Sequence, residues 1–353
     1  MDAEIFAASI RAASRARPLR IRGGGSKDFY GGTAVGAVLD TRHYAGIVNY
    51  EPTELVITAR AGTALAEIEA TLAHQGQFLA FEPPSFGADG NSEATIGGVV
   101  AAGLSGPRRA AVGAVRDFVL GVKLMDGEAR TLTFGGQVMK NVAGYDVSRL
   151  MAGSLGTLGL ILEVSLTVLP RPVVERSLRF ELPAAQAIER LGTWAAKPLS
   201  LSASCWHQGQ LTVRLSGAHA AVEAAQRAMG GDPLADAETF WRDLREQSHG
   251  FFAGDEPLWR LSLPPSAALV DLPGPQLIEW NGGQRWLRGT LAPARVRAAV
   301  SAAGGHATLF RAGDKSVGVF HPLPAPLMEL HRRLRSAFDP RGIFDAGRLY
   351  SDF

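Results

Sequence analysis

The sequence predicts an α+β protein of two domains. The chain has 353 residues, of which 46% are hydrophobic, and this length favours two domains over one. Short strand-like and helix-like segments alternate along it without a short-period repeat. Pro170-Arg171-Pro172 ends an apolar strand, and the pattern of segments changes after it. We therefore expect a first domain over residues 1–170 and a second beginning at 171.

Apolar spacing predicts the elements of the first domain. Leu65, Ile68 and Leu72 recur at helical spacing, and Gly76 suits the end of that helix. Alternation on both sides of Asp126-Gly127 is typical of a hairpin. The expected elements in order are a helix over 2–17, strands over 18–22 and 55–60, a helix over 63–76, a hairpin over 117–134 and a strand over 158–169.

The second domain is expected to mix strands and helices more evenly. The predicted strands cover 174–182, 211–215, 258–263, 277–280, 284–290 and 306–310. The predicted helices cover 184–195, 218–229, 236–248, 292–303 and 324–337. This organisation indicates a compact α+β domain.

The composition excludes several classes of function. The formal net charge is +2 and no run of five arginines occurs, so nucleic acid is not an expected partner. One cysteine, Cys205, cannot form an intrachain disulfide or a thiolate metal site, and no two of the eight histidines have metal-pair spacing. No stretch approaches the roughly 18 apolar residues of a membrane span. We expect a soluble, cytoplasmic protein without a metal, whose membrane contact, if any, is peripheral and through partners.

Glycines concentrate where backbone is expected to approach a ligand. Arg22-Gly23-Gly24-Gly25-Ser26-Lys27 follows the strand at 18–22, and three successive glycines leave their amides unshielded, so several N–H groups can converge on an anion. The loop is neither the dinucleotide fingerprint nor a P-loop. Turn chemistry alone is the competing explanation for any one such cluster.

A second segment, residues 94–106, follows Pro83-Pro84 at a distance and contains almost no bulky side chain. Such a segment gains little from packing. Either a ligand takes the place of the missing side chains, or a small-residue helix packs closely on a sheet. Both readings stay open at this point.

A third glycine-rich stretch combines Lys140–Asp146 with residues 153–159. Ala152-Gly153-Ser154-Leu155-Gly156 approaches a hydrolase nucleophile elbow, but that turn requires a helix after the serine. The sequence predicts a strand there instead, which argues against a serine hydrolase.

Together these motifs resemble FAD-binding domains of the vanillyl-alcohol-oxidase/PCMH type. Within that superfamily the chain resembles the FAD-binding subunits of bacterial glycolate oxidase, including a tail that begins Phe338-Asp339-Pro340. The resemblance is dense over 20–170, thin over 171–335 and clear again in the tail. It implies a PCMH-type two-subdomain FAD-binding domain over 1–170, a smaller α+β cap domain over 171–335, and a tail over 336–353 that returns to the FAD domain.

The resemblance also assigns roles to residues. Gly23, Gly24, Gly25 and Ser26 would offer amides to the FAD pyrophosphate, with Thr95, Gly97 and Gly98 on its other side. Ala101, Gly103 and Ser105 would follow the ribityl chain and the flavin, and Gly153, Gly156, Gly159 and Ile161 would line the adenosine. The remaining expected cofactor-binding residues are Arg22, Lys27, Pro84, Ile96 and Arg348.

Three departures from the family pattern bear on the chemistry. Ser26 stands where covalent relatives carry a histidine, so FAD is expected to be noncovalent. The cap has Gly313-Asp314-Lys315 without the paired histidines of relatives that oxidise 2-hydroxy acids by themselves. In the tail, Asp345-Ala346 replaces the usual Asn-Pro.

The resemblance implies a subunit of a multi-subunit glycolate (2-hydroxy acid) oxidase that carries electrons from the hydroxy acid through its flavin. Its expected partners are a larger FAD-containing subunit and an iron–sulfur subunit, because one cysteine cannot hold a cluster. Two alternatives remain: a structural, non-catalytic FAD subunit, and a self-sufficient FAD-dependent dehydrogenase. For the latter, the candidate catalytic residues are Lys140, Tyr145, Arg285, Arg288, His306 and Arg311.

Overall fold

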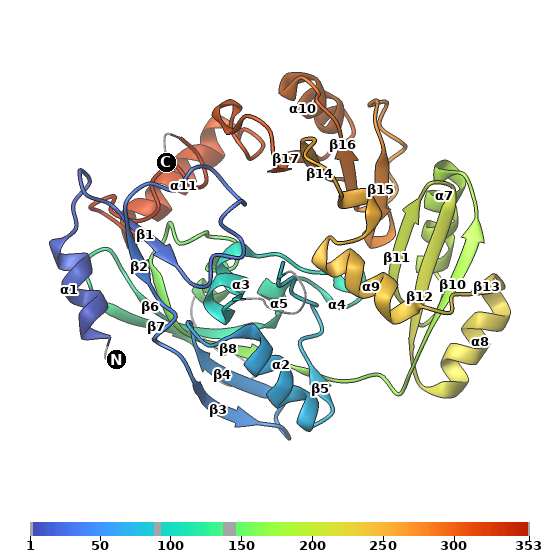
Figure 1. Ribbon diagram of the computed structural model, residues 1–353, viewed down its shortest axis with the longest axis horizontal. Helices are drawn as coiled ribbons and strands as arrows, with labels where there is room; N and C mark the ends of the chain where they lie inside the picture. The colour runs from blue at the N-terminus through green and yellow to red at the C-terminus, as the bar shows by residue number, and fades with distance from the viewer. Residues whose placement is uncertain (1–2, 88–92, 137–145, 352–353) are drawn as a thin grey trace. The chain divides into compact units, whose positions relative to one another are not determined.

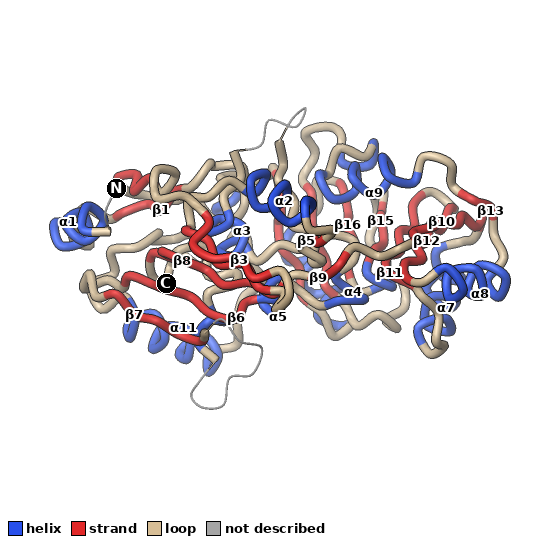
Figure 2. The backbone as a smooth tube through the Cα atoms, turned by 90° about the horizontal axis from the view of Figure 1, so that it is seen from below, coloured by secondary structure: helices blue, strands red, loops and turns tan. Residues whose placement is uncertain are grey.

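The computed structural model describes residues 3–87, 93–136 and 146–351, and the chain divides into two compact units. Unit 1 contains Met1–Leu104, Ala114–Pro170 and Pro322–Phe353. Unit 2 contains Ser105–Gly113 and Arg171–His321. Figures 1 and 2 show their elements.

Unit 1 is built on a five-stranded antiparallel sheet (Figure 1). Its central strands, β4 and β8, are buried along nearly their whole length, as their continuous apolar sequences require. In spatial order the strands are β3 (Ile47–Glu51), β4 (Val56–Arg60), β8 (Leu160–Thr167), β6 (Val119–Met125) and β7 (Thr131–Gly135). The hairpin expected over 117–134 is confirmed as β6 and β7, with Met125 opposite Thr131.

A parallel pair, β1 (Leu19–Arg22) and β2 (Ala37–Asp40), ties the chain's beginning to its end. The Leu19 amide donates to the Ile343 carbonyl at 2.7 Å, and the Asp345 amide donates to the Leu19 carbonyl at 2.9 Å. Ile343 and Phe344 are fully buried in one core with residues of α1 (Glu4–Ala12) and β8. The tail is thus an integral part of unit 1.

The helices of unit 1 follow the predicted apolar stripes. In α2 (Leu65–His74), the residues Leu65, Ile68 and Leu72 are all buried as expected, and Gly76 follows the helix with φ of +63°. The first helix is shorter than the expected 2–17. The other elements of unit 1 are α3 (Ile96–Ala102), α5 (Val115–Phe118), α6 (Val147–Leu150), α11 (Ala325–Phe338), and the short pair β5 (Gln77–Phe78) and β9 (Leu169–Pro170).

Unit 2 is an eight-stranded antiparallel sheet. In spatial order the strands are β13 (Asp232–Pro233), β10 (Val174–Glu181), β12 (Gln210–Gly217), β11 (Leu201–His207), β15 (Gln276–Glu279), β16 (Gln284–Arg288), β14 (Leu258–Ser262) and β17 (His306–Arg311). The strand β11 was missing from the sequence-based prediction.

One face of this sheet carries two apolar cores under helices (Figure 1). Leu211, Val213 and Leu215 of β12 pack with α7 (Ala184–Ala195) and α8 (His219–Met229), and Trp259 and Leu261 of β14 pack with α10 (Pro293–Ala302). The remaining helical elements are α4 (Arg109–Val112), α9 (Ala237–Glu246), η2 (Gly250–Phe252), η3 (Trp280–Gly282) and η4 (Lys315–Val317).

The segment Ser105–Gly113 belongs to unit 2 although the sequence places it within 1–170. Buried Arg108 pairs with the Glu175 carboxylate and donates to Ser216 Oγ at 3.2 Å. Arg109 lies over the Trp280 ring, whose Nε1 donates to the Gly106 carbonyl at 3.1 Å. These polar contacts with distant strands are what attach the segment to unit 2.

The last helix, α11, belongs to unit 1, whereas the expected boundary at 335 assigned most of it to the cap. Arg335 donates to the Phe344 carbonyl at 2.9 Å, and the Asp339 carboxylate accepts from the amides of Ile343 and Phe344. The Phe338 carbonyl accepts from Gly127 of the β6–β7 turn at 2.8 Å. The helix is therefore anchored by the tail that follows it.

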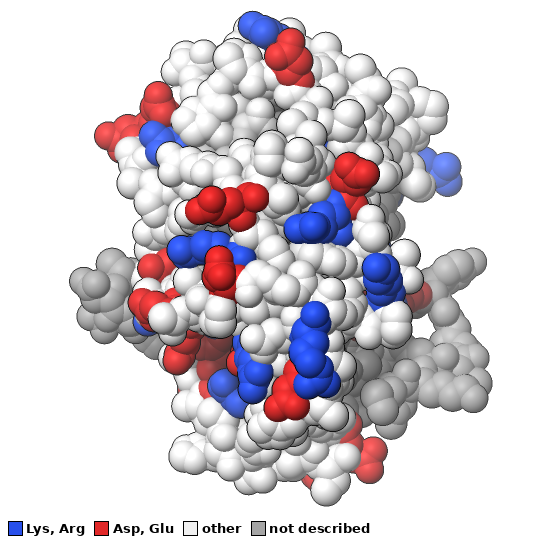
Figure 3. All heavy atoms as spheres, turned by 90° about the vertical axis from the view of Figure 1, so that its right-hand side faces the viewer, with Lys and Arg blue, Asp and Glu red and all other residues white. Residues whose placement is uncertain are grey.

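Two surface properties bear on partners. In the described part of the chain, no helix combines the length and apolarity that crossing a membrane requires. On the face seen in Figure 3, basic and acidic side chains lie interspersed.

Candidate functional site

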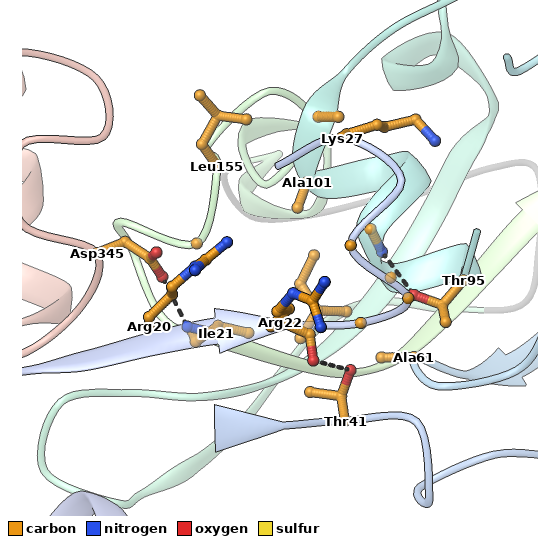
Figure 4. Close-up of a pocket in the computed structure, with 18 of the residues that line it drawn as sticks. Arg20, Ile21, Arg22, Lys27, Thr41, Ala61, Thr95, Ala101, Leu155 and Asp345 are labelled. Atoms are coloured by element: carbon orange, nitrogen blue, oxygen red, sulfur yellow. Dashed lines mark hydrogen bonds between the residues drawn. The ribbon is translucent and has the colours of Figure 1, made fainter. Parts of the chain in front are cut away.

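Unit 1 contains a pocket that encloses about 800 Å³, including solvent at its mouth. The loop after β1, the helix α3, the start of β8 and the tail form its walls (Figure 4). The lining residues are Arg20, Ile21, Arg22, Gly23, Gly24, Gly25, Ser26, Lys27, Asp28, Thr41, Ala61, Thr95, Gly97, Gly98, Ala101, Ala102, Leu155, Gly156, Gly159, Ile161, Asp345 and Arg348.

Residues 23–26 form a loop after the β1–β2 sheet, and the amides of this loop do not take part in the hydrogen bonding of the sheet. The last ladder contact is made by Thr41, whose amide and hydroxyl both donate to the Arg22 carbonyl, at 3.0 and 3.4 Å. Gly25 then turns the chain with φ of +77°, and its carbonyl accepts from Asp28. Within the described residues, the amides of positions 23–26 donate to no protein acceptor. Unshielded successive amides form an anion-binding concavity.

The glycines at 23 and 24 allow this loop to pack against another backbone segment. A Cβ at Gly24 would lie 1.5 Å from the Glu93 carbonyl oxygen, and a Cβ at Gly23 would lie 2.2 Å from Thr95 Oγ1. These two glycines are therefore required by protein packing, whatever binds in the pocket.

The helix α3 explains the small residues over 94–106, which the sequence could relate either to a ligand or to close packing on a sheet. Gly97 faces the sheet: its amide donates to the Ala61 carbonyl at 2.9 Å, and a Cβ there would lie 2.6 Å from Ala61 Cβ. Gly97 also lines the pocket, as do Gly98 and Ala101, and the nearest described atom outside the helix backbone to a Cβ at Gly98 is Thr95 Oγ1 at 3.3 Å. The small residues thus serve both close packing and the pocket.

The opposite wall is formed by the segment that leads into β8. The Leu155 amide donates to the Ala101 carbonyl at 2.9 Å, which joins this wall to α3. Gly156 and Gly159 have φ of +81° and +141°, a region that favours glycine. Gly156, Gly159 and Ile161 are all buried, so this end of the pocket is enclosed.

Arginines dominate the charge around the pocket. The Asp28 carboxylate pairs with Arg20 at 2.7 Å and Arg22 at 2.8 Å; burial raises the pKa of Asp28, but these two guanidinium groups outweigh it and hold the pKa below its ordinary value. Arg348 donates to the carbonyls of Lys27, Asp28 and Gly32 at 3.0 to 3.1 Å, which fixes the loop from the tail side. Burial lowers the pKa of Arg348.

Asp345 is a buried carboxyl group in this lining, with 2% of its surface exposed. Its Oδ2 accepts from the Ile21 amide at 3.1 Å, the dashed line beside Asp345 in Figure 4. Burial raises the pKa of Asp345 to about 7, against the opposing effects of the Ile21 amide and of the Arg348, Arg20 and Arg335 guanidinium groups.

The structure brings most of the predicted cofactor-binding residues into this one pocket. Those that line it are Arg22, Gly23, Gly24, Gly25, Ser26, Lys27, Thr95, Gly97, Gly98, Ala101, Gly156, Gly159, Ile161 and Arg348. The amide of Gly97 donates to the Ala61 carbonyl, so this N–H group is already used within the protein.

Five expected residues lie outside the lining. Ile96 is fully buried in the core, and Pro84 is buried too. Gly103 ends α3 with φ of +67°, and a Cβ there would lie 2.7 Å from Gly153 Cα, so Gly103 and Gly153 allow two backbones to meet. Ser105 belongs to unit 2.

Sequence reasoning missed several lining residues: Arg20, Ile21, Asp28, Thr41, Ala61, Ala102, Leu155 and Asp345. One signal was available, since Arg20 and Arg22 alternate on a strand that ends at the glycine loop, and period-2 spacing places them on one face. Asp345 was visible only as a departure from a family pattern.

The candidate catalytic residues that the structure describes do not form a cluster. Lys140 and Tyr145 lie outside the described residues. His306 is the first residue of β17, opposite Ser262, whereas Arg311 is the last and donates to Gln247 Oε1 at 2.6 Å. His306 and Arg311 are therefore at opposite ends of β17, which has a register shift against β14 between Leu258 and Trp259.

Arg285 and Arg288 are held by other parts of unit 2. Arg285 is fully buried and donates to the carbonyls of Gly282, Ala267 and Ala268. Arg288 donates to the Phe251 carbonyl and pairs with Glu256, both at 2.9 Å. Both guanidinium groups therefore have structural roles.

Comparisons with known proteins show which proteins this chain is similar to. The family model described as FAD binding domain matches residues 2–147. The chain is 49% identical over 342 residues to the glycolate oxidase subunit GlcE of Escherichia coli K12, covering 97% of this chain and 95% of that protein. It is 30% identical over 164 residues to the glycolate oxidase subunit GlcD of Bacillus subtilis, which covers 46% of this chain and 34% of that protein.

A comparison with solved structures shows which known fold this chain is similar to. Alkyldihydroxyacetonephosphate synthase superposes with a TM-score of 0.64 at 14% identity, over 97% of this chain and 74% of that one. This agrees with the predicted PCMH-type architecture and an α+β fold. The chain matches the FAD binding domain and is 49% identical to GlcE over 97% of its length. It therefore belongs to the family of the glycolate oxidase subunit GlcE, and it is an FAD-dependent oxidoreductase.

Proposed function

We propose that this chain is the FAD-binding subunit of a multi-subunit glycolate (2-hydroxy acid) oxidase, and that its FAD lies in the pocket of unit 1. One observation carries the location: residues 23–26 line the pocket, and their four successive amides donate to no acceptor among the residues that the structure describes. A pyrophosphate would satisfy them without a lysine, and the nearby Arg20 and Arg22 complement its charge.

The two ends of the pocket suit the two halves of FAD. The end at Gly156, Gly159 and Ile161 is enclosed, and it would hold the adenosine. The side lined by Gly98 and Ala101 is partly exposed, and it would hold the ribityl chain and lead to the flavin, which a substrate must reach. Flavin chemistry supplies acceptance of a hydride and its release as single electrons. The residues of this chain bind and orient the cofactor.

The electrons must leave through another protein. The single cysteine, Cys205, is 1% exposed within β11, and burial raises its pKa well above the ordinary value, so it cannot contribute to a cluster. We infer that the partners are an iron–sulfur subunit and a larger FAD-containing subunit. The 30% identity with GlcD, confined to 164 residues, supports a second FAD protein of related fold.

Purification of the tagged chain from its native host tests the assembly. We expect it to copurify with an iron–sulfur protein and a second flavoprotein, identified by mass spectrometry, and the complex to oxidise glycolate with an artificial acceptor. Recovery of the chain alone, active with glycolate at the rate of the whole extract, would instead establish a self-sufficient dehydrogenase. A complex whose activity persists after this subunit loses its FAD would indicate a structural role.

A further inference from the structure

The pocket contains a buried carboxyl group, Asp345, whose presence is not accounted for by binding of the FAD pyrophosphate. Asp345 is 2% exposed, and its backbone is fixed, because its amide donates to Leu19 at 2.9 Å and its carbonyl accepts from Arg348 at 3.1 Å. Its φ is +39°, an uncommon value for a residue with a side chain. The side chain is therefore held at one place in the wall.

This carboxyl group has unused capacity as an acceptor. A carboxylate can accept about four hydrogen bonds. Among the described residues, Asp345 accepts one, from the Ile21 amide to Oδ2 at 3.1 Å. The cations that act on it are Arg20 of β1, Arg348 of the tail and Arg335 of α11. Arg20 pairs with Asp28, and Arg348 donates to backbone carbonyls, so neither forms an ion pair with Asp345.

A carboxylate here would repel a phosphate, so it must face a part of the ligand that carries hydrogen-bond donors and no charge. Asp345 lies at the enclosed end: a Cβ at Gly156 would be 2.7 Å from Oδ2. Figure 4 shows Asp345 beside Arg20 and Ile21, away from Thr95 and Ala61. The flavin must be reachable by a substrate, whereas the nucleoside can be enclosed.

We propose that the Asp345 carboxylate accepts a hydrogen bond from the adenosine half of FAD, either from the adenine amino group or from a ribose hydroxyl, and so selects FAD over flavin mononucleotide. This inference rests on the proposed location of FAD in the pocket. The raised pKa of the buried group agrees with it, because the site is desolvated before the donor arrives.

The test compares the wild-type apoprotein with Asp345→Asn, which keeps an oxygen for the Ile21 amide and presents an NH₂ group to the ligand. Binding of FAD and of flavin mononucleotide is followed by flavin fluorescence at pH 8. Loss of a hydrogen bond to a charged group should weaken FAD about 10-fold to 100-fold and leave flavin mononucleotide unchanged. Asp314→Asn, an exposed position in unit 2, is the matched control. Equal changes for both flavins, or no change, would overturn the inference.

Displacement of FAD by nucleotides separates the two donors. Inosine diphosphate lacks the amino group of ADP, and the 2′-deoxy and 3′-deoxy forms of ADP each lack one hydroxyl. In the wild type, one of these analogues should bind about 10-fold more weakly than ADP. In Asp345→Asn, the same analogue should bind as tightly as ADP. Preferences that are identical in both proteins would refute a contact with adenosine.

The pH dependence gives an independent readout. Since the ionised carboxylate is the acceptor, FAD affinity should be full above the pKa of about 7 and fall as the pH drops through it, and this decline should be absent in Asp345→Asn. The arginines near Asp345 stay charged throughout.

The Gly98→Leu variant distinguishes the two proposals. If Gly98→Leu leaves FAD binding intact, the proposed location of FAD is wrong. If Gly98→Leu blocks FAD binding while Asp345→Asn has no effect, only the proposed role of Asp345 is wrong.

Discussion

Gly24 lies against the backbone of Glu93 so closely that an added Cβ would be 1.5 Å from the Glu93 carbonyl oxygen. A Cβ at Gly97 would be 2.6 Å from the Ala61 Cβ and 2.9 Å from the Ala61 carbonyl oxygen. From the sequence, valine at either position would be expected to abolish FAD binding more than it reduces stability. The structure revises this expectation, because valine at position 24 or 97 would displace protein backbone or a packed methyl group and destabilise the fold as well.

Gly98→Leu is the variant that should separate binding from stability. Gly98 lines the pocket, and among the described atoms outside its own helix backbone a Cβ there would meet Thr95 Oγ1 alone, at 3.3 Å. Replacing a helical glycine should stabilise α3 by up to about 1 kcal/mol, while the side chain fills space that FAD needs. We expect at least about a 10-fold loss of FAD affinity with an unchanged or higher unfolding temperature of the apoprotein.

Gly192→Leu provides the matched control for this variant. Gly192 is a helical glycine in α7 of unit 2, and no atom lies within 4 Å of a Cβ built on it. It should gain similar helix stability and retain full FAD. A Gly98→Leu protein that purifies with one FAD per chain would contradict the assignment of the pocket.

Asp345 should make the apoprotein less stable at high pH. Its pKa is about 7 in the folded chain and near 3.8 when unfolded, so the folded state holds the proton more tightly. The contribution of Asp345 to stability should therefore be fully present at low pH and decline as pH rises from about 4 to 7. Asp345→Asn removes this penalty, and we expect it to be more stable than the wild type at pH 8 by up to a few kcal/mol.

Urea unfolding of both apoproteins at pH 5 and pH 8 measures this difference. The advantage of Asp345→Asn should be larger at pH 8. If the two proteins show the same change in unfolding free energy between the two pH values, the buried carboxyl group is not titrating in this range.

FAD should be released completely by acid precipitation. Ser26 lines the pocket where covalent relatives carry histidine, and no histidine, cysteine or tyrosine is among the described lining residues. Cys205 is buried in unit 2. All flavin absorbance should appear in the supernatant, and a flavin-bearing peptide in the digested pellet would show covalent attachment.

The isolated chain should not oxidise glycolate or D-lactate at an enzymatic rate. Such oxidation needs a base for the hydroxyl proton and a cation for the carboxylate, and the described candidates His306 and Arg311 are at opposite ends of β17. Anaerobic mixing with either acid should leave the flavin oxidised, while dithionite bleaches it. Rapid bleaching by an acid that is lost in His306→Ala would favour the self-sufficient dehydrogenase.

Much of the pocket could be predicted because its signals are local. Three consecutive glycines after a strand, and a run of small residues over 94–106, describe backbone that must approach something closely, and this can be read without knowing the fold. The apolar stripe of Leu65, Ile68 and Leu72 fixed α2 for the same reason, since 3.6-residue spacing alone selects the buried face.

What each glycine approaches was decided only by the tertiary structure. Gly97 and Gly98 are adjacent in one helix and both line the pocket, yet a Cβ would meet Ala61 at Gly97 and Thr95 at Gly98, because a rotation of about 100° per residue turns them to different neighbours. Asp345 contacts Ile21 across 324 residues of sequence, and no spacing rule encodes such a contact. The sequence by itself thus indicated where backbone amides could converge on an anion. Chain folding determined which distant carboxyl group and arginines complete the wall, because their convergence depends on the packing of the tail against β1.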